Sequence, residues 1–153
     1  MVRSRAARAE PPPADESIRY IETSALLAAI LEQDAEATEQ LRADGLRVTS
    51  ALTFAEAGRV IVRAGRTGLL TSSQERAVVR KLRTFERRCH VLAITDDILA
   101  RVRRPFPVEP IRTLDAIHLA TAEFLGEPPI LMSILTRDKR IGRTARAMGY
   151  SVE

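Results

Sequence analysis

The sequence predicts an α/β fold in which a central parallel β-sheet lies between two layers of helices, a three-layer α/β/α sandwich. Short apolar runs that suit strands alternate along the chain with longer segments whose apolar residues recur at helical spacing. Two of these runs, 91–94 and 130–135, are almost entirely apolar and do not alternate with polar residues, which is typical of parallel strands covered on both faces. A length of 153 residues suits one domain.

The predicted domain follows an N-terminal lead. Residues 1–16 are rich in arginine, alanine and proline, a composition typical of disorder, so we expect the domain to span residues 17–153. In its first half, Ser or Thr can cap the helices and Gly can end them. The elements predicted there are a strand at 18–21, a helix at 25–31 capped by Thr23 or Ser24, a helix at 35–42, a strand at 46–49, a helix from 52 to Gly65 or Gly68, and a long helix from Ser72 or Ser73 through Phe85.

The second half continues the alternation, apart from an irregular segment that contains Pro105, Pro107 and Pro110. Thr113 can cap the helix after that segment. The elements predicted there are a strand at 91–94, a helix from 95 to about 102, a helix at 114–125, a strand at 130–135, a helix at 138–148 and a short strand at 150–152.

The charge of the chain favours a polyanionic partner such as nucleic acid, since the net charge is +4 and the pI is near 10. The basic residues are nearly all arginine, with Lys81 and Lys139 the only lysines, and a GC-rich genome produces the same bias without a functional reason. Only 4% of the residues are aromatic and none is Trp, which argues against a surface that stacks bases on aromatic rings.

The composition also predicts a cytoplasmic protein without membrane association. Cys89 is the only cysteine, which excludes an internal disulfide and fits a reducing compartment. No apolar run approaches the ~20 residues that a membrane helix needs. No apolar segment follows the arginines of the N-terminal lead, so a secretory signal is not expected.

Four acidic residues follow predicted strands or begin predicted helices. Glu22 comes directly after the first strand, Glu56 lies early in the helix after the second strand, and Asp138 follows the strand that ends at Leu135. In open parallel sheets, ligands bind beyond the carboxyl ends of the strands. Asp115 joins the other three acids if its helix begins at the same edge of the sheet.

Each of these acids also has a purely structural explanation. Thr53-Phe54-Ala55-Glu56 matches a capping box, in which the glutamate accepts a hydrogen bond from the backbone of the cap residue. Asp115 suits the positive end of a helix dipole. Asp138 can cap the helix that follows it, and Glu22 can be a polar strand end.

The neighbours of the acids favour a functional interpretation. Glu22 follows an apolar strand, Glu56 lies between two alanines and Asp115 is followed by Ala-Ile, surroundings in which an unpaired carboxylate is costly. Clustered carboxylates repel one another unless a cation lies between them. Oxygen ligands without a Cys/His set suit Mg²⁺ or Mn²⁺ rather than zinc, and such ions activate water and bind phosphodiesters.

Four motifs in the chain resemble those of PIN-domain nucleases, in the same order. The similarity covers about residues 18–153, and the third motif resembles the family most closely. The size and single-domain form resemble the VapC toxins of type II toxin–antitoxin pairs. The motifs are Tyr20-Ile21-Glu22-Thr23-Ser24-Ala25-Leu26, Leu52-Thr53-Phe54-Ala55-Glu56, Leu114-Asp115-Ala116-Ile117-His118-Leu119-Ala120-Thr121-Ala122, and Leu135-Thr136-Arg137-Asp138-Lys139-Arg140 with the later Ala147-Met148-Gly149.

This resemblance implies a PIN fold, endoribonuclease activity with Mg²⁺ or Mn²⁺, a homodimer, and a cognate antitoxin whose tail covers the acidic site. It assigns the carboxylate set to Glu22, Glu56, Asp115 and Asp138, with Glu56 as a candidate to orient the attacking water. Ser24 and Thr136 match polar positions that support the site. The cations beside the fourth motif are candidate RNA phosphate contacts: Arg137, Lys139, Arg140 and Arg143.

One position departs from the family, which usually has Asp where this chain has Glu22. The extra methylene shifts the carboxylate and adds a rotamer, which loosens a site that needs tight positioning. An alternative hypothesis is therefore a PIN fold without catalysis that binds RNA or protein. A third, a phosphatase or receiver domain using Asp96-Asp97, is disfavoured because the chain lacks a Gly-rich phosphate loop.

Several other polar residues have structural explanations that compete with functional ones. His118 can share a helix face with Asp115 as a metal ligand, but a packed, hydrogen-bonded histidine is the favoured interpretation. His90 begins a strand and Asp96-Asp97 begins a helix, which are structural roles. A row of arginines in the long helix can follow an RNA backbone or form a solvated face: Arg76, Arg80, Arg83, Arg87 and Arg88.

Overall fold

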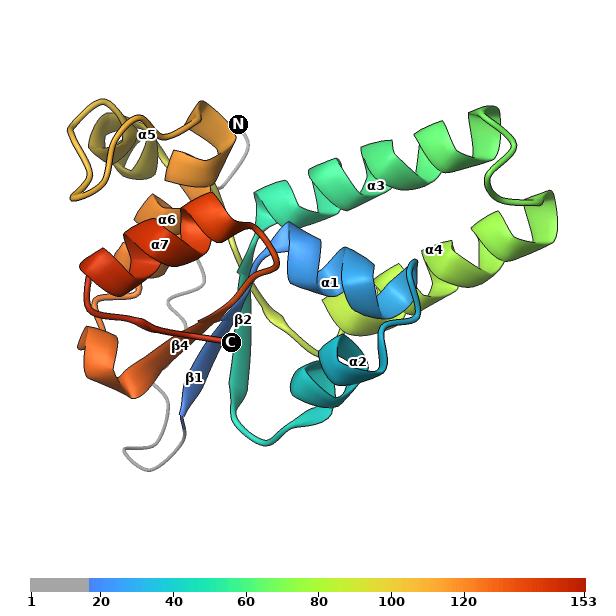
Figure 1. The fold of residues 1–153 in the computed structure, drawn as a ribbon, viewed down its shortest axis with the longest axis horizontal. Coiled ribbons are helices and arrows are strands. Elements are labelled where there is room, and N and C mark those ends of the chain that lie inside the picture. The colour runs from blue at the N-terminus through green and yellow to red at the C-terminus, as the bar shows by residue number, and fades with distance from the viewer. Residues whose placement is uncertain (1–16) are drawn as a thin grey trace, which may run out of the picture.

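A computed structural model describes residues 17–153 and confirms the α/β architecture. The predicted N-terminal lead, 1–16, lies outside the described residues. One all-parallel sheet has the strand order β3-β2-β1-β4-β5, and helices cover both of its faces (Figure 1). The strands are β1 (Ile18–Ile21), β2 (Leu46–Ser50), β3 (His90–Leu92), β4 (Met132–Leu135) and β5 (Ser151–Val152).

Each predicted helix is present, with small shifts at the ends. The helices are α1 (Thr23–Ile30), α2 (Ala35–Arg42), α3 (Ala51–Arg66), α4 (Ser72–Glu86), α5 (Asp96–Val102), α6 (Thr113–Glu123) and α7 (Lys139–Ala147). The long α3–α4 hairpin extends away from the sheet (Figure 1).

The central strand β1 divides the core between the two faces of the sheet. Successive side chains of a strand point to opposite faces. Ile18 and Tyr20 pack in the cluster that contains the apolar residues of α6 and α7, whereas Ile21 packs with apolar residues of α1, α3 and α4. All four residues of β1 are buried, so this strand fixes the positions of the elements on either side.

Two apolar runs are less covered than the sequence predicts. β3 is an edge strand, and the side chains of Val91 and Ile94 in the predicted 91–94 run are both exposed. Ile130 and Leu131 lie outside β4 because Pro129 begins a 3₁₀ turn, Pro129–Leu131, and a proline has no N–H to donate to a sheet. The side chain of Ile130 is 87% exposed.

One charged residue, Arg19, is buried within β1. Its guanidinium pairs with the Glu153 carboxylate at 2.6 Å and donates to the backbone oxygens of Gln40 and Ala43. A buried charge is tolerated when it is paired and hydrogen-bonded. Arg19 therefore connects the central strand to the carboxyl end of α2 and to the residue after β5.

The sheet has its switch point between β1 and β4. From β1 the chain proceeds through β2 to β3 on one side, and β4 and β5 lie on the other side. Helices that leave the carboxyl ends of β1 and β4 diverge to opposite faces and open a crevice, which is where ligands bind in such sheets. Within residues 17–153, no helix is both long and apolar enough to cross a bilayer.

Candidate active site

The four predicted acids are placed around the switch-point crevice. Glu22 directly follows β1, and Asp138 follows β4 as the N-cap residue of α7. Glu56 projects from α3, which leaves β2, and Asp115 lies in the first turn of α6. His118, three residues after Asp115 in α6, has its Nε2 3.9 Å from Glu22 Oε1, so the start of α6 lies at the same edge of the sheet as the end of β1.

Two hydroxyl groups hold the Glu22 carboxylate. Glu22 is 5% exposed, and its Oε2 accepts a hydrogen bond from Thr136 Oγ1 at 2.7 Å and another from Ser24 Oγ. Ser24 Oγ in turn accepts from the Arg137 backbone N–H at 2.8 Å. The predicted supporting residues, Ser24 and Thr136, thus contact the carboxylate itself.

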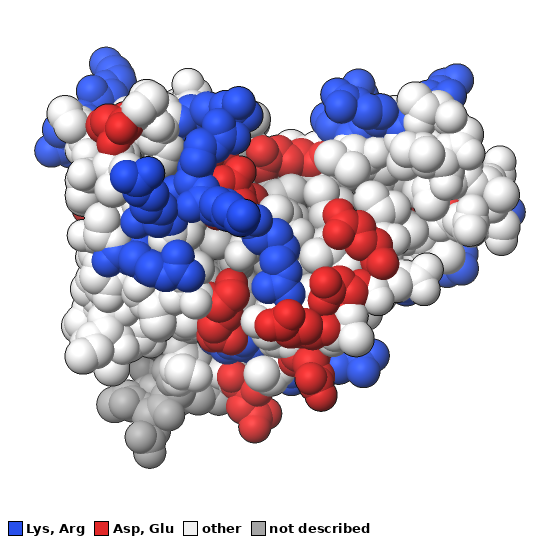
Figure 2. All heavy atoms as spheres, in the orientation of Figure 1, with Lys and Arg blue, Asp and Glu red and all other residues white. Residues whose placement is uncertain are grey.

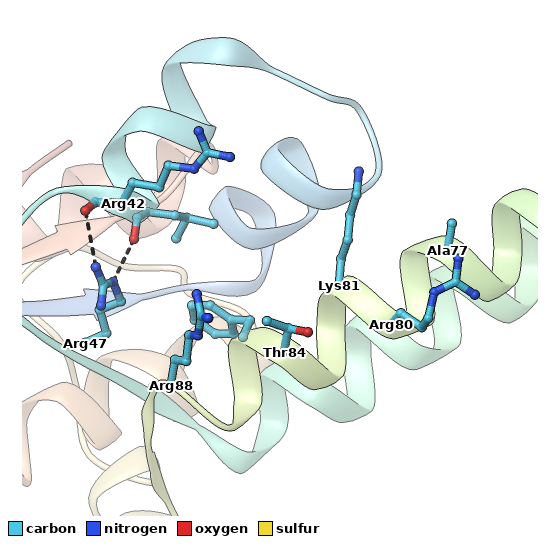
Figure 3. Close-up of a pocket in the computed structure, with 9 residues that line it drawn as sticks. Arg42, Arg47, Ala77, Arg80, Lys81, Thr84 and Arg88 are labelled. Atoms are coloured by element: carbon cyan, nitrogen blue, oxygen red, sulfur yellow. Dashed lines mark hydrogen bonds between the residues drawn. The ribbon is translucent and has the colours of Figure 1, made fainter.

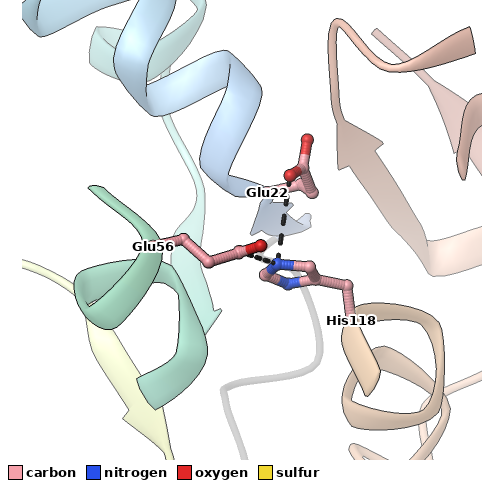
Figure 4. A group of neighbouring side chains, drawn as sticks. All are labelled: Glu22, Glu56 and His118. Carbon is pink, nitrogen blue, oxygen red and sulfur yellow. Dashed lines mark hydrogen bonds and ion pairs between the residues drawn. The ribbon is translucent and has the colours of Figure 1, made fainter. Parts of the chain in front are cut away.

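Glu56 is held by His118 and Thr23. Its Oε2 accepts from His118 Nε2 at 2.7 Å (Figure 4). The same oxygen accepts from Thr23 Oγ1 at 2.5 Å. Burial raises the pKa of Glu56, but the hydrogen bonds from His118 and Thr23 outweigh it, so the net pKa is lowered. No hydrogen bond to Oε1 is present among the described residues. Glu56 is therefore an ionised acid with one free oxygen.

His118 is the buried centre of this network. It is 1% exposed, and its Nδ1 lies 2.9 Å from the Tyr20 hydroxyl. Burial, with the nearby Glu22 charge, raises the pKa of Tyr20 well above its ordinary value, so the hydroxyl keeps its proton. Because Nε2 faces the Glu56 carboxylate, Nε2 donates to Glu56, and the Tyr20 hydroxyl holds the ring through Nδ1. The packed, hydrogen-bonded histidine favoured by the sequence is therefore what the structure contains.

Asp115 differs from the other acids because it is not satisfied. Its Oδ2 is buried and has no hydrogen-bond partner among the described residues. Burial raises the pKa of Asp115, and the charges of Asp138 and Glu22 raise it further, although the charges of Arg140 and Arg112 oppose them. A buried carboxylate oxygen without a partner is unfavourable, which indicates that a cation belongs beside it.

Asp138 has a structural role as well as its place at the site. Its Oδ1 accepts from the backbone N–H groups of Arg140 and Ile141, at 2.7 and 3.3 Å, so it caps α7. The Arg140 guanidinium lies 3.8 Å from Oδ2. The helix-cap explanation is thus confirmed for Asp138, and one of its oxygens remains free of backbone contacts.

The capping explanation is wrong for Glu56. α3 begins at Ala51, and its N-cap is Ser50, whose hydroxyl accepts from the Leu52 N–H. Thr53 lies inside the helix, where its hydroxyl contacts Thr49 Oγ1, so Glu56 cannot close a capping box. Thr23 and Thr113 are likewise not caps, since the N-cap residues of α1 and α6 are Glu22 and Arg112 and neither makes a side-chain cap.

The donor atoms of the site fall into two neighbouring groups. The first group consists of one ligand atom from each of Glu22, Glu56 and His118, and these three atoms lie within 4.8 Å of one another (Figure 4). Within it, Glu22 Oε1 and His118 Nε2 are 3.9 Å apart, which is too far for a hydrogen bond. Asp115 lies outside this group, but the charges of Asp138 and Glu22 are near enough to raise its pKa. Oxygen donors predominate in both groups, which suits a hard divalent cation.

Basic side chains flank the acids. Figure 2 shows a basic band across the region of α7, with acidic side chains on both sides of it. Lys139 and Arg143 are exposed and make no ion pair among the described residues. Arg137 differs from these two because its guanidinium lies 3.8 Å from Asp34 Oδ1, toward the start of α2.

Sequence reasoning missed two residues of the network, Tyr20 and Thr23. Both lie in the first motif, but Tyr20 reads as a core strand residue and Thr23 as a helix cap. Both residues hydrogen-bond to His118, which is 95 or more positions away in the sequence, so no local sequence pattern predicts these contacts. The pairing of the third motif with the first is the only signal that could have found them.

Comparison with known proteins identifies the family of the chain. The PIN domain family model matches residues 19–147. The chain is 34% identical to Ribonuclease VapC35 of Mycobacterium tuberculosis over 137 residues, covering 87% of this chain and 93% of the relative.

Two solved structures share the fold. VapBC2 from Rickettsia felis, bound to a DNA fragment from its promoter, superposes with a TM-score of 0.63 at 12% identity, over 89% of this chain and 97% of the other. A toxin–antitoxin complex from Klebsiella pneumoniae gives a TM-score of 0.54 at 23% identity, over 81% and 89%. The family match, the VapC relative and the shared fold together establish that this chain belongs to the PIN-domain family, as a VapC-like member.

Proposed function

We propose that this chain is a divalent-metal-dependent endoribonuclease, the toxin of a toxin–antitoxin pair, and that it hydrolyses RNA phosphodiesters at Glu22, Glu56, Asp115 and Asp138. The observation that carries the proposal is the buried, unpartnered Oδ2 of Asp115 beside two further carboxylates. A relative that is a named ribonuclease over nearly the whole chain supports the substrate class.

The donor set fits Mg²⁺ or Mn²⁺. Asp115, Glu22 and Asp138 supply carboxylate oxygens from three different elements, and Asp115 Oδ2 lacks any other partner. A divalent cation there would lower the pKa of a water molecule and offset charge on the scissile phosphate. These three acids would hold the ion, and Glu56 adds a fourth negative charge at the same edge of the sheet.

The chain's own groups supply positioning and proton transfer. Glu56 is ionised, fixed through Oε2 by His118 and Thr23, and free at Oε1, so Oε1 is suited to orient the attacking water and accept its proton. Tyr20 fixes the ring of His118 in turn. A base held in this way loses little conformational entropy when the substrate binds.

Phosphate contacts are supplied from α7. Three cations follow Asp138 at the start of α7: Lys139, Arg140 and Arg143. The guanidinium of Arg140 lies 3.8 Å from the Asp138 carboxylate. Arginine forks suit phosphate oxygens, and such contacts position a strand without reading its sequence. Arg137 is a weaker candidate because Asp34 and Glu36 neighbour its guanidinium.

Glu22 in place of the family's usual aspartate is compatible with activity. The extra methylene adds a rotamer, but hydroxyl donors from Ser24 and Thr136 fix the carboxylate in a buried position. The looseness expected from the longer side chain is therefore offset by packing and hydrogen bonds.

Partners follow from the family and from the surface. We propose a cognate antitoxin that covers the acidic site, since related folds occur in VapBC and toxin–antitoxin complexes. We also propose a homodimer, because exposed apolar side chains on α3 and α5 include Val60, Val62 and Leu99. We further propose that the protein acts in the cytoplasm, where it would meet its RNA substrate.

The test is RNA cleavage with Mg²⁺ or Mn²⁺ by wild type, Asp115→Asn and Asp97→Asn. Asp97 is an exposed acid of α5 outside the site, so it is the matched control. We expect Asp115→Asn to lose more activity than the roughly 100-fold that removal of an outer metal partner costs, and Asp97→Asn to retain it. A wild-type protein that leaves every RNA uncut with both metals would refute the proposal.

A further inference from the structure

A groove outside the acidic site runs between α2 and α4. It encloses about 760 Å³, and its rim carries cations from both sides: Arg42, Arg47, Arg80, Lys81 and Arg88 (Figure 3). Leu41 and Phe85 form part of an apolar floor, and no carboxylate of residues 17–153 lines the groove. The groove therefore combines a hollow shape with charge of one sign.

The basic surface continues along α4 beyond this groove. A second hollow of about 520 Å³ shares Arg80 with the first and adds Arg76 and Arg83. The one acid in its lining, Glu75, has its carboxyl group against Gly65 of α3. Arg76, Arg80 and Arg83 recur at the spacing that places residues on one helix face.

The cations of this surface are unpaired. Among residues 17–153, Arg19 and Arg101 form close ion pairs, but no carboxylate lies within 4.0 Å of Arg80, Lys81 or Arg88. Arg47 is held by the backbone oxygen of Leu41 at 2.7 Å, which fixes one wall of the groove. Unpaired like charges repel, so this arrangement favours an anionic occupant.

The layout of the charges indicates an extended polyanion and not a small anion. At 1.5 Å per residue, the run from Arg76 to Arg88 is roughly 18 Å long. The charges do not converge on one point, since α4 carries them about one helical turn apart while Arg42 and Arg47 face them from the other wall. A chain of phosphates has this shape and charge spacing.

We propose that the α2–α4 groove binds the sugar–phosphate backbone of an RNA strand, as a second anchor for the substrate. This inference rests on the proposed ribonuclease function. Arginine dominates the groove, and its planar fork suits phosphate oxygens. The acidic crevice itself repels phosphates through Glu22, Glu56, Asp115 and Asp138, so a separate basic surface compensates for that repulsion.

The position of the groove predicts which RNA uses it. Arg47 lies at the start of β2 and Arg88 just before β3, so the groove flanks the amino edge of the sheet, whereas the acids lie at the carboxyl edge. With about 3.3 Å per strand residue, these edges are roughly 15 Å apart. A strand of a few nucleotides reaches only the acids, and a longer RNA reaches both.

The test is RNA binding by the full chain carrying Asp115→Asn to block cleavage. One variant adds Arg80→Glu, Lys81→Glu and Arg88→Glu. Its control adds Arg59→Glu, Arg63→Glu and Arg66→Glu, three exposed residues of α3 with the same charge change. Circular dichroism checks that both variants fold, and fluorescence anisotropy of a labelled long single-stranded RNA gives the Kd at several salt concentrations.

We expect the groove variant to weaken binding of the long RNA more than tenfold and to reduce the salt slope by about 2, since each lost contact to a single strand removes about 0.7. The control should change far less. Equal weakening by both variants would overturn the proposal in favour of general charge attraction. Unchanged RNA binding together with lost binding of polyglutamate would overturn it in favour of an acidic protein occupant.

Cleavage of a short RNA separates this inference from the proposed function. In the active background, with Asp115 retained, the groove variant should cut a substrate of a few nucleotides at the wild-type rate and a long RNA more slowly at subsaturating concentration. Normal cutting of both lengths would refute the groove while leaving the ribonuclease intact.

Discussion

The two halves of the acidic site differ in how they accommodate negative charge. In the paired half, Glu56 is hydrogen-bonded to His118 and Thr23, and His118 is completed by Tyr20. In the unpaired half, Asp115 has a buried oxygen without a partner and two acidic neighbours. The shifts in pKa follow this division, since the pKa of Glu56 is lowered and that of Asp115 is raised.

Folding alone completes the hydrogen bonds of the paired half, whereas it leaves the unpaired half incomplete. The hydrogen bonds of the paired half stabilise the native state and fix the base before any ligand arrives. The unpaired half keeps like charges close together at a cost in stability, as functional sites commonly do. The following variants should separate the two halves by their effects on stability.

The largest effect is expected for His118→Ala in the paired half. The substitution leaves the Tyr20 hydroxyl and one Glu56 contact unsatisfied and opens a cavity, so the free energy of unfolding should fall by about 3 kcal/mol. Urea denaturation measures it. His90→Ala, at the exposed histidine of β3, is the control and should change the value by less than about 0.5 kcal/mol. A small loss for His118→Ala would contradict a preformed paired half.

Divalent metal should act on the unpaired half. Mg²⁺ or Mn²⁺ at about 100 times its Kd should stabilise the wild type by roughly 2.7 kcal/mol. Differential scanning calorimetry with and without EDTA measures the shift in Tm. Asp115→Asn should lose most of this shift, whereas Asp97→Asn should keep it. If neither metal changes the Tm of the wild type, the unpaired half does not bind a divalent cation, and this prediction is wrong.

A smaller loss is expected for Tyr20→Phe, which removes the hydroxyl that His118 Nδ1 contacts at 2.9 Å. The volume is nearly kept, so the free energy of unfolding should fall by about 1 kcal/mol. Tyr150→Phe is the matched control, because Tyr150 is also buried and its hydroxyl makes no hydrogen bond among the described residues. If both variants lose the same stability, the Tyr20 hydroxyl is not part of the paired half.

The smallest effect, and the one of opposite sign, is expected for Asp115→Asn in metal-free buffer. Burial, then Asp138 and Glu22, raise the pKa of Asp115 in the folded protein. In the window between the unfolded and folded pKa values, the native state binds more protons, so wild-type stability falls as pH rises. The variant should therefore be more stable at neutral pH, by up to about 1 kcal/mol.

Urea unfolding of both proteins over a pH series tests this sign. The advantage of Asp115→Asn should vanish as pH falls below the unfolded pKa of aspartate, because Asp115 is then protonated in both states. Added Mg²⁺ or Mn²⁺ should reverse the order at neutral pH. A wild type more stable than Asp115→Asn without metal would show that the carboxylate is already satisfied.

Much of the fold could be predicted because the signals are local. Helical spacing and continuous apolar runs located each helix and strand, although Thr23 and Thr113 are not the caps that were predicted. The predictions failed where a tertiary property decided: strand order leaves Val91 at a sheet edge, and the turn at Pro129 takes Ile130 out of β4. The residues of one strand determine neither the order of the strands in the sheet nor whether other elements cover an edge strand.

The site was predictable only in outline. Placement after strand ends brought Glu22 and Asp138 to one edge, but the partners of Glu56 come from α1 and α6. The capping-box pattern at Thr53 misled because Ser50 begins the helix one turn earlier. Hydrogen-bond networks among distant segments depend on packing, which local patterns do not encode.

The residue that pairs with buried Arg19, Glu153, connects the last strand of the sheet to the acidic site. The Glu153 N–H donates to Ile134 and its carbonyl oxygen accepts from Thr136 N–H, while the Thr136 hydroxyl holds Glu22. A bulky group fused directly after Glu153 would strain this strand pairing and, through Thr136, displace the Glu22 carboxylate. Purification tags for activity measurements therefore belong at the other end of the chain.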